Sequence, residues 1–143
     1  MKRFHVNLAV ANLAQSIDFY RTLFGEDPTV LKDDYAKWML DDPRVNFSIS
    51  QSSRLTGVSH IGLQADTMSE LGEIQERLHN AGQATLEQPD AECCYARSSK
   101  TWVRDPDDVA WETFVTHNDI THYGSDRAPQ QGEAAKEISR CCA

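Results

Sequence analysis

The feature that most constrains this chain of 143 residues is that one pattern of expected strands and helices occurs in it twice. In the first copy, alternating apolar residues over 4–10 predict a strand. Apolar residues over 13–24 then recur at the spacing of one helix face. Asn12 and Gly25 are typical of the start and end of such a helix. Three strand-like runs follow, at 29–31, 35–40 and 45–50.

The second copy repeats this order with different residues. Alternation over 58–64 predicts a strand, and Thr67 and Glu70 have the T-x-x-E spacing of a helix capping box. The helix ends at the 80–82 turn signal, and strand-like runs follow at 84–86, 101–104 and 109–115. The chain therefore reads as βαβββ twice.

The two copies also match in their chemistry. His5 precedes the first helix cap by seven residues, and His60 precedes the second cap by the same seven. Aligning the last strands of the two copies sets Ser48 against Glu112. Two half-units of this kind bury a shared face, which brings equivalent strands together. The predicted fold is therefore α+β, with two tandem βαβββ modules forming one curved mixed sheet around a metal site at His5, His60 and Glu112.

The expected organisation has three parts. The first module covers residues 1–54, the second covers 55–116, and 117–143 form a polar C-terminal tail. The second module is longer because of a loop at about 87–99, which carries Cys93 and Cys94.

The four cysteines form two adjacent pairs, Cys93-Cys94 and Cys141-Cys142. Adjacent pairs do not suggest a disulfide framework, whereas two neighbouring thiols form a soft chelate for thiophilic ions. The alternative is that they are small, partly buried residues without a role. Adjacent side chains on a regular strand point to opposite faces, so chelation of one atom requires the backbone to leave extended geometry. Turn-forming residues over 88–92 favour such a departure.

Charge and hydropathy exclude several partners. Fourteen basic and 22 acidic residues give a net charge of -8, which disfavours nucleic acid. The sequence has no apolar run long enough to cross a bilayer, and its N-terminal stretch carries no signal-peptide cleavage pattern. We expect a cytoplasmic protein that binds a small molecule, as a monomer or a homodimer.

These residues resemble a known family. The doubled βαβββ order with ligands on first and last strands is similar to the vicinal oxygen chelate superfamily, which includes glyoxalase I, extradiol dioxygenases and antibiotic-resistance proteins. The resemblance covers residues 1 to about 116. Within it, FHVNLAV, SHIGLQ, the Cys93-Cys94 loop and WETF resemble the branch of the C–As lyases and cadmium-induced proteins.

The resemblance implies an oxygen-dependent C–As lyase with Fe(II). Such an enzyme cleaves the carbon–arsenic bond of trivalent organoarsenicals, such as methylarsenite or aromatic arsenicals, and releases arsenite. His5, His60 and Glu112 would form the catalytic metal site, since Ser48 is a poor ligand and three ligands leave positions open for oxygen chemistry. The opposing interpretation is that both histidines are satisfied strand residues. Ni(II), Co(II) or Zn(II) could replace Fe(II) in purified protein.

Cys93 and Cys94 are the predicted substrate-binding residues. A trivalent methylarsenical has two exchangeable oxygens, and one dithiol can replace both. Asp90 and Glu92 are expected to raise the pKa of these thiols, with Arg97 or Lys100 able to offset them.

Two alternatives stay open at this stage. The first is a binding protein that sequesters Cd(II) or As(III) through cysteine sulfur without catalysis. The second is an extradiol ring-cleaving dioxygenase, which uses the same ligand triad but has no need for adjacent cysteines. No metal role is expected for His79, His117 or His122, and only a non-essential role for Cys141 and Cys142.

Overall fold

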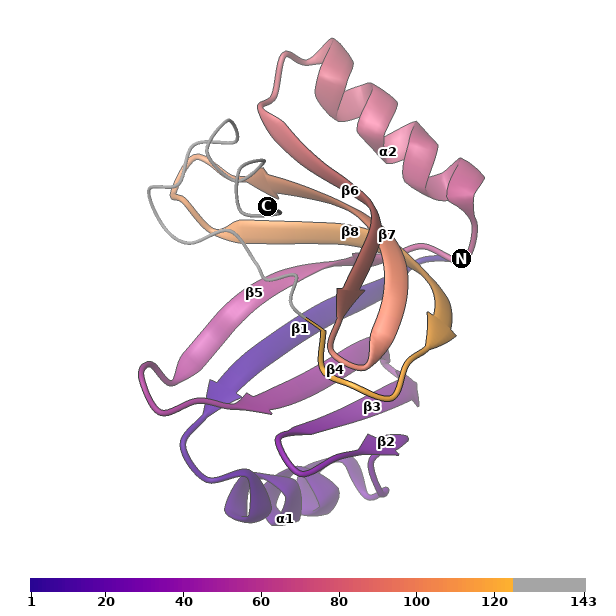
Figure 1. Ribbon diagram of the computed structural model, residues 1–143. Helices are drawn as coiled ribbons and strands as arrows, with labels where there is room; N and C mark the ends of the chain where they lie inside the picture. Colours follow the sequence, from indigo (N-terminus) through magenta and orange to yellow (C-terminus); the bar gives the residue numbers. More distant parts are fainter. Residues whose placement is uncertain (125–143) are drawn as a thin grey trace. The chain divides into compact units, whose positions relative to one another are not determined.

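The computed structural model describes residues 1–124, and it contains the two successive βαβββ modules that the repeat predicts. The first consists of β1 (Arg3–Val10), α1 (Leu13–Phe24), β2 (Val30–Leu31), β3 (Tyr35–Asp41) and β4 (Arg44–Gln51). The second consists of β5 (Gly57–Gln64), α2 (Met68–Asn80), β6 (Thr85–Cys93), β7 (Ala96–Arg104) and β8 (Ala110–Asp119). The hydrogen-bonded order of the strands is β2-β3-β4-β1-β5-β8-β7-β6. Figure 1 labels each strand and helix. The predicted α+β fold class is confirmed.

One compact unit spans Arg3–Ile61. In it, β1 runs parallel to β4, and β4 runs antiparallel to β3. Asn12 caps α1 by accepting a hydrogen bond from the Gln15 backbone N–H at 3.0 Å. Gly25 ends the helix at a φ of 74°, where a side chain would be strained. One helix face packs on the sheet over a core of Val10, Leu13, Ile17, Ala36, Trp38, Leu40, Phe47 and Ile49.

Among the described residues, the other unit contains residues 62–124 together with Met1 and Lys2. Here β6, β7 and β8 form an antiparallel set, and α2 contributes Leu71 to a small core with Ala65 and Val115. The predicted cap at Thr67 is confirmed, because its hydroxyl accepts a hydrogen bond from the Glu70 N–H at 3.2 Å.

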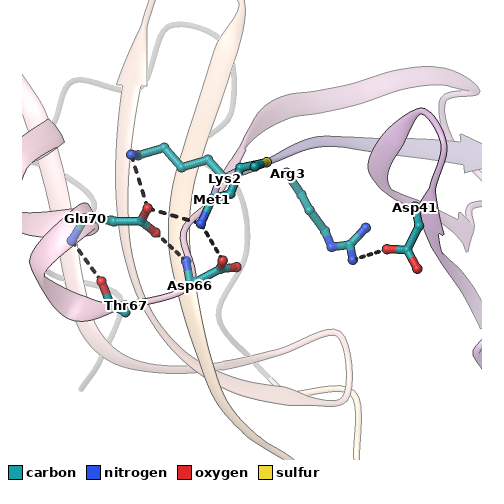
Figure 2. A network of polar contacts seen from close by, with 7 residues as sticks. All are labelled: Met1, Lys2, Arg3, Asp41, Asp66, Thr67 and Glu70. Carbon is teal, nitrogen blue, oxygen red and sulfur yellow. Dashed lines mark hydrogen bonds and ion pairs between the residues drawn. The ribbon is translucent and has the colours of Figure 1, made fainter.

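Polar contacts hold the N-terminal residues against the start of α2. The Met1 amino group donates to Asp66 at 2.6 Å, and the Lys2 ammonium lies 3.6 Å from Glu70 (Figure 2). Figure 2 also shows the ion pair between Arg3 and Asp41, which belongs to the unit of β1 and β3.

The segment that carries the cysteine pair differs from the expected loop. Residues 85–104 form a β-hairpin of β6 and β7, with Cys93 paired to Ala96 across a two-residue turn. Pro89 lies at a register shift between Gln88 and Ala91, and a bulge is one of the few places where a strand accepts proline. The sequence therefore shows turn-forming residues where the structure has an irregular strand.

The last strand also extends further than its apolar pattern indicates. β8 continues to Asp119, and residues 120–124 then return to the β6–β7 hairpin, where Gly124 forms a bridge with Cys93. Cys141 and Cys142 lie outside the described residues. Across residues 1–124, the structure contains no helix of the length and apolar character needed to span a bilayer.

Candidate functional site

His5 lies on β1, opposite Asn46 of β4. Its Nδ1 is 3.1 Å from the Asn46 carbonyl oxygen, which can only accept a hydrogen bond. The ring is therefore protonated at Nδ1, and its Nε2 carries a lone pair. A backbone carbonyl that fixes the tautomer in this way is the usual outer partner of a metal-binding histidine.

His60 lies on β5, and its Nε2 atom faces the Nε2 atom of His5. The two Nε2 atoms are 3.2 Å apart, and the His60 Nδ1 lies 3.2 Å from the Ser59 hydroxyl. These distances allow a chain of hydrogen bonds in which Ser59 donates to His60 and His60 donates to His5. A cation would take the place of the shared proton, because the Ser59 hydroxyl can equally accept from the His60 Nδ1–H.

Glu112 of β8 completes a buried group with these two histidines. The candidate ligand atoms of His5, His60 and Glu112 all lie within 4.8 Å of one another, and the three residues are 6%, 8% and 5% exposed. Metal–nitrogen bonds of roughly 2.1 Å at a right angle place two nitrogens about 3.0 Å apart. The observed spacing of the imidazoles therefore fits one divalent cation. Two imidazoles and one carboxylate are the donor set of non-heme iron enzymes.

Sequence reasoning missed the structural partner of Glu112. The Lys100 ammonium on β7 donates to Glu112 Oε1 at 2.7 Å, and both side chains are buried. Lys100 also lies 5.8 Å from the centre of the Trp102 ring. Burial lowers the pKa of Lys100, but the Glu112 carboxylate outweighs it and the net pKa is raised, so the lysine is charged. No signal in the sequence pairs these two residues, because the contact is diagonal across two strands.

Ser48, the counterpart of Glu112 in the first module, is not a metal ligand candidate. It is 1% exposed, and its hydroxyl accepts a hydrogen bond from the Asn7 side-chain amide at 2.7 Å.

The cysteine pair lies at the tip of the β6–β7 hairpin. Cys94 and Tyr95 form its turn with φ values of 56° and 62°, and the Cys93 and Cys94 sulfurs are 3.0 Å apart. A two-residue turn with both φ values positive departs from extended geometry, as chelation by adjacent cysteines requires. Both thiols are free and partly buried.

The two thiols have opposite acidities. Hydrogen bonding with the Cys93 thiol, and then with the Tyr123 hydroxyl, lowers the pKa of Cys94 to about 7, against the effect of burial. The hydrogen bond to Cys94 and burial raise the pKa of Cys93. Cys94 is therefore the thiol that loses its proton first as the pH rises, while Cys93 keeps its proton.

Of the four charges expected from the sequence to act on this pair, only Lys100 is among the groups that shift the pKa values of the two thiols. Asp90 is paired with Arg97, and Glu92 is paired with His122. The buried Glu112 instead raises the pKa of both thiols, and Lys100 lowers it.

The other histidines have separate partners. His117 Nε2 lies 2.8 Å from the Ser99 hydroxyl, and His122 contacts Glu92 at 3.0 Å. His79 is in the last turn of α2. In residues 1–124, His5, His60 and Glu112 form the group of His, Cys, Asp or Glu side chains arranged to hold a metal.

Comparison with known proteins shows which family and which enzymes this chain is similar to. The profile of the Glyoxalase/Bleomycin resistance protein/Dioxygenase superfamily matches residues 2–113. A trivalent organoarsenical cleaving enzyme from Bacillus sp. strain MD1 is 36% identical over 99% of this chain and 91% of its own. A probable trivalent organoarsenical cleaving enzyme from Bacillus subtilis strain 168 is 39% identical over 81% of each chain.

The chain is also similar in fold to solved structures. Homoprotocatechuate 2,3-dioxygenase from Brevibacterium fuscum matches 83% of this chain with a TM-score of 0.62 and 15% identity. The chain spans 37% of that dioxygenase's length. At this identity the match concerns the fold alone.

Proposed function

The chain belongs to the glyoxalase/bleomycin resistance protein/dioxygenase superfamily, and from this we propose that it is an Fe(II)- and O2-dependent C–As lyase. Its substrates would be trivalent organoarsenicals, such as methylarsenite or aromatic arsenicals, and its product arsenite. The observation that carries the proposal is the thiol pair of Cys93 and Cys94, whose sulfurs are 3.0 Å apart. The buried Glu112 carboxylate is close enough to contribute to the raised pKa of Cys93. The two organoarsenical-cleaving relatives support the same assignment.

His5, His60 and Glu112 are the residues that would hold the iron. Their buried imidazole and carboxylate atoms suit a divalent cation, and the Asn46 carbonyl keeps the His5 lone pair directed at it. When bound, ferrous iron would supply the activation of dioxygen that cleavage of a carbon–arsenic bond needs. Ni(II), Co(II) and Zn(II) fit the same donors and would bind at least as tightly.

Cys93 and Cys94 would bind the arsenic atom. Two sulfurs replace the two oxygens of the arsenical and leave its carbon–arsenic bond intact. A pair already held in a tight turn loses little conformational freedom on binding, and it fixes the arsenic relative to the rest of the site. Lys100 would contribute by balancing the buried Glu112 charge and by favouring thiolate at the pair.

Turnover in air tests the proposal. Protein loaded with Fe(II) and given methylarsenite should release more than one arsenite per chain when oxygen is present, and none under anoxia. Cys93→Ser should stop arsenite release but retain the metal, whereas Glu112→Gln should lose metal. A Cys93→Ser protein with full activity would refute the role of the thiols.

The second candidate is sequestration of Cd(II) or As(III) by cysteine sulfur. It is favoured by the Cys93-Cys94 geometry, since two adjacent sulfurs can bind a soft ion without any metal at the His-His-Glu group. Sequestration is stoichiometric and indifferent to oxygen, so the same experiment separates it from catalysis. An extradiol dioxygenase would cleave catechol substrates and would be unaffected by Cys93→Ser.

A further inference from the structure

The chain after β8 forms a short strap over the cysteine turn, at residues 120–124. The Ile120 N–H donates to the Tyr95 carbonyl at 2.9 Å, and the Tyr95 N–H donates to the Tyr123 carbonyl at 3.5 Å. Both hydrogen bonds hold the turn residue that follows Cys94. The strap is therefore attached to the backbone of the turn itself (Figure 1).

The end of the strap passes very close to the hairpin. Gly124 forms a bridge with Cys93, and a Cβ built on it would lie 1.9 Å from the Glu92 carbonyl oxygen. Its φ of 86° is also a conformation that favours glycine. Only glycine allows this approach, and it places Tyr123 beside the pair.

Tyr123 contacts the cysteine turn through both ends of its side chain. Its hydroxyl is 3.5 Å from the Cys94 sulfur, and its ring meets the Tyr95 ring edge to face, with centroids 5.7 Å apart at 87°. The ring contact fixes the direction of the hydroxyl, which is the group able to stabilise a thiolate.

We propose that Tyr123 is a positioning residue that holds Cys94 as the thiolate and thereby makes it the first sulfur to attack a trivalent arsenical. The thiolate half of this inference stands on the 3.5 Å contact between the Tyr123 hydroxyl and the Cys94 sulfur, and the arsenical half rests on the proposed function. The lowered pKa of Cys94, which the Cys93 thiol and then the Tyr123 hydroxyl produce, agrees with this order.

The capture step balances as two substitutions at arsenic. The Cys94 thiolate forms the first sulfur–arsenic bond and one arsenic–oxygen bond breaks. The departing hydroxide takes the proton of the Cys93 thiol and leaves as water. The resulting Cys93 thiolate forms the second sulfur–arsenic bond, and the second hydroxide leaves to solvent. Arsenic stays trivalent and no electrons are transferred.

The pH profile of thiol alkylation tests the first half. The background is the full chain with Cys141→Ser and Cys142→Ser, so that iodoacetamide reports on Cys93 and Cys94. Tyr123→Phe keeps the ring and removes the hydroxyl. We expect alkylation at neutral pH to slow by roughly three- to ten-fold. At high pH, where Cys94 is a thiolate in every variant, the rate should be unchanged.

His122→Gln is the matched control, because it breaks the strap's contact with Glu92 and leaves the phenol in place. It should keep the wild-type pH profile. A merely structural role for Tyr123 would instead leave the pH profile of Tyr123→Phe unchanged and would overturn the inference. Gly124→Ala, which displaces the strap, should reproduce the Tyr123→Phe profile.

The second half is measured as the rate of methylarsenite binding to metal-free protein. Tyr123→Phe should slow this rate by the same factor as alkylation, and raising the pH should rescue it. Equal binding rates would overturn the order of attack. Because no iron and no turnover are involved, failure here is distinguishable from failure of the proposed lyase activity.

Discussion

At the residue scale, the candidate site consists of buried polar side chains that each have a hydrogen-bond or ion-pair partner. The imidazole of His5 is oriented by the Asn46 carbonyl, and the Glu112 carboxylate is neutralised by Lys100. Burial of an unpaired charge is costly, so each of these contacts has a consequence for stability that can be measured separately from activity.

Lys100→Met tests the buried ion pair. It leaves the Glu112 carboxylate buried without its cation, so we expect the metal-free protein to lose about 3 kcal/mol or more of its free energy of unfolding. Urea denaturation measures this loss. Arg97→Gln breaks an exposed pair with Asp90 and should change stability little. Equal effects of the two substitutions would contradict the account.

The acidity of the thiol pair predicts a pH dependence. The pKa of Cys94 is about 7, so its reactive thiolate forms as the pH rises through 7 and is lost as the pH falls below it. Alkylation of the wild-type pair should slow about tenfold for each pH unit below 6. A rate that rises only above pH 8.5 would show that the thiols are ordinary.

The sequence predicts the chemical groups of the site better than their surroundings. His5 and His60 follow from the matched registers of two copies, and the cysteine pair is visible as adjacent letters. Lys100 was missed as the partner of Glu112, and Tyr123 was missed as a neighbour of the cysteine pair. One acts across two strands and the other lies beyond the repeat, so neither has a local pattern.

At the element scale, one glycine allows β5 to approach the backbone of β8 closely. A Cβ on Gly62 would lie 1.8 Å from the Glu112 carbonyl oxygen, which is backbone and cannot rotate away. Glycine therefore permits the close approach of β5 that sets the position of Glu112.

Gly62→Ala tests this approach. We expect a loss of about 1–3 kcal/mol of unfolding free energy and weaker metal binding, because the two strands must separate. Gly72→Ala is the matched control, since nothing lies within 4 Å of a Cβ at Gly72 in α2. It should stabilise the protein by about 0.5–1 kcal/mol. Denaturation curves of both variants decide the point.

The helices and most strands could be predicted from periodicity and caps, as Asn12 and Thr67 illustrate. The β6–β7 hairpin could not, because Pro89 and Asp90 are typical of loops and the bulge that accommodates them depends on pairing with β7. The end of β8 was also missed, since pairing with β7 continues it into polar residues.

At the scale of the whole molecule, metal binding should couple to folding. A site formed by residues 5, 60 and 112 does not exist in the unfolded chain, so a bound ion adds its binding free energy to stability. We expect Ni(II) or Fe(II) to raise the melting temperature of the wild type, and a chelator to reverse the rise. In Glu112→Gln the metal should have little effect. A rise that survives this substitution would place the ion elsewhere.

The most direct test of the central claim is an anaerobic calorimetric titration of Fe(II) into the wild type and into His5→Ala, His60→Ala and Glu112→Ala. We predict one ion per chain for the wild type and a loss of affinity of at least about tenfold in each variant. Cys93→Ser should bind Fe(II) as the wild type does. Retention of wild-type affinity by any of the three ligand variants would contradict the account.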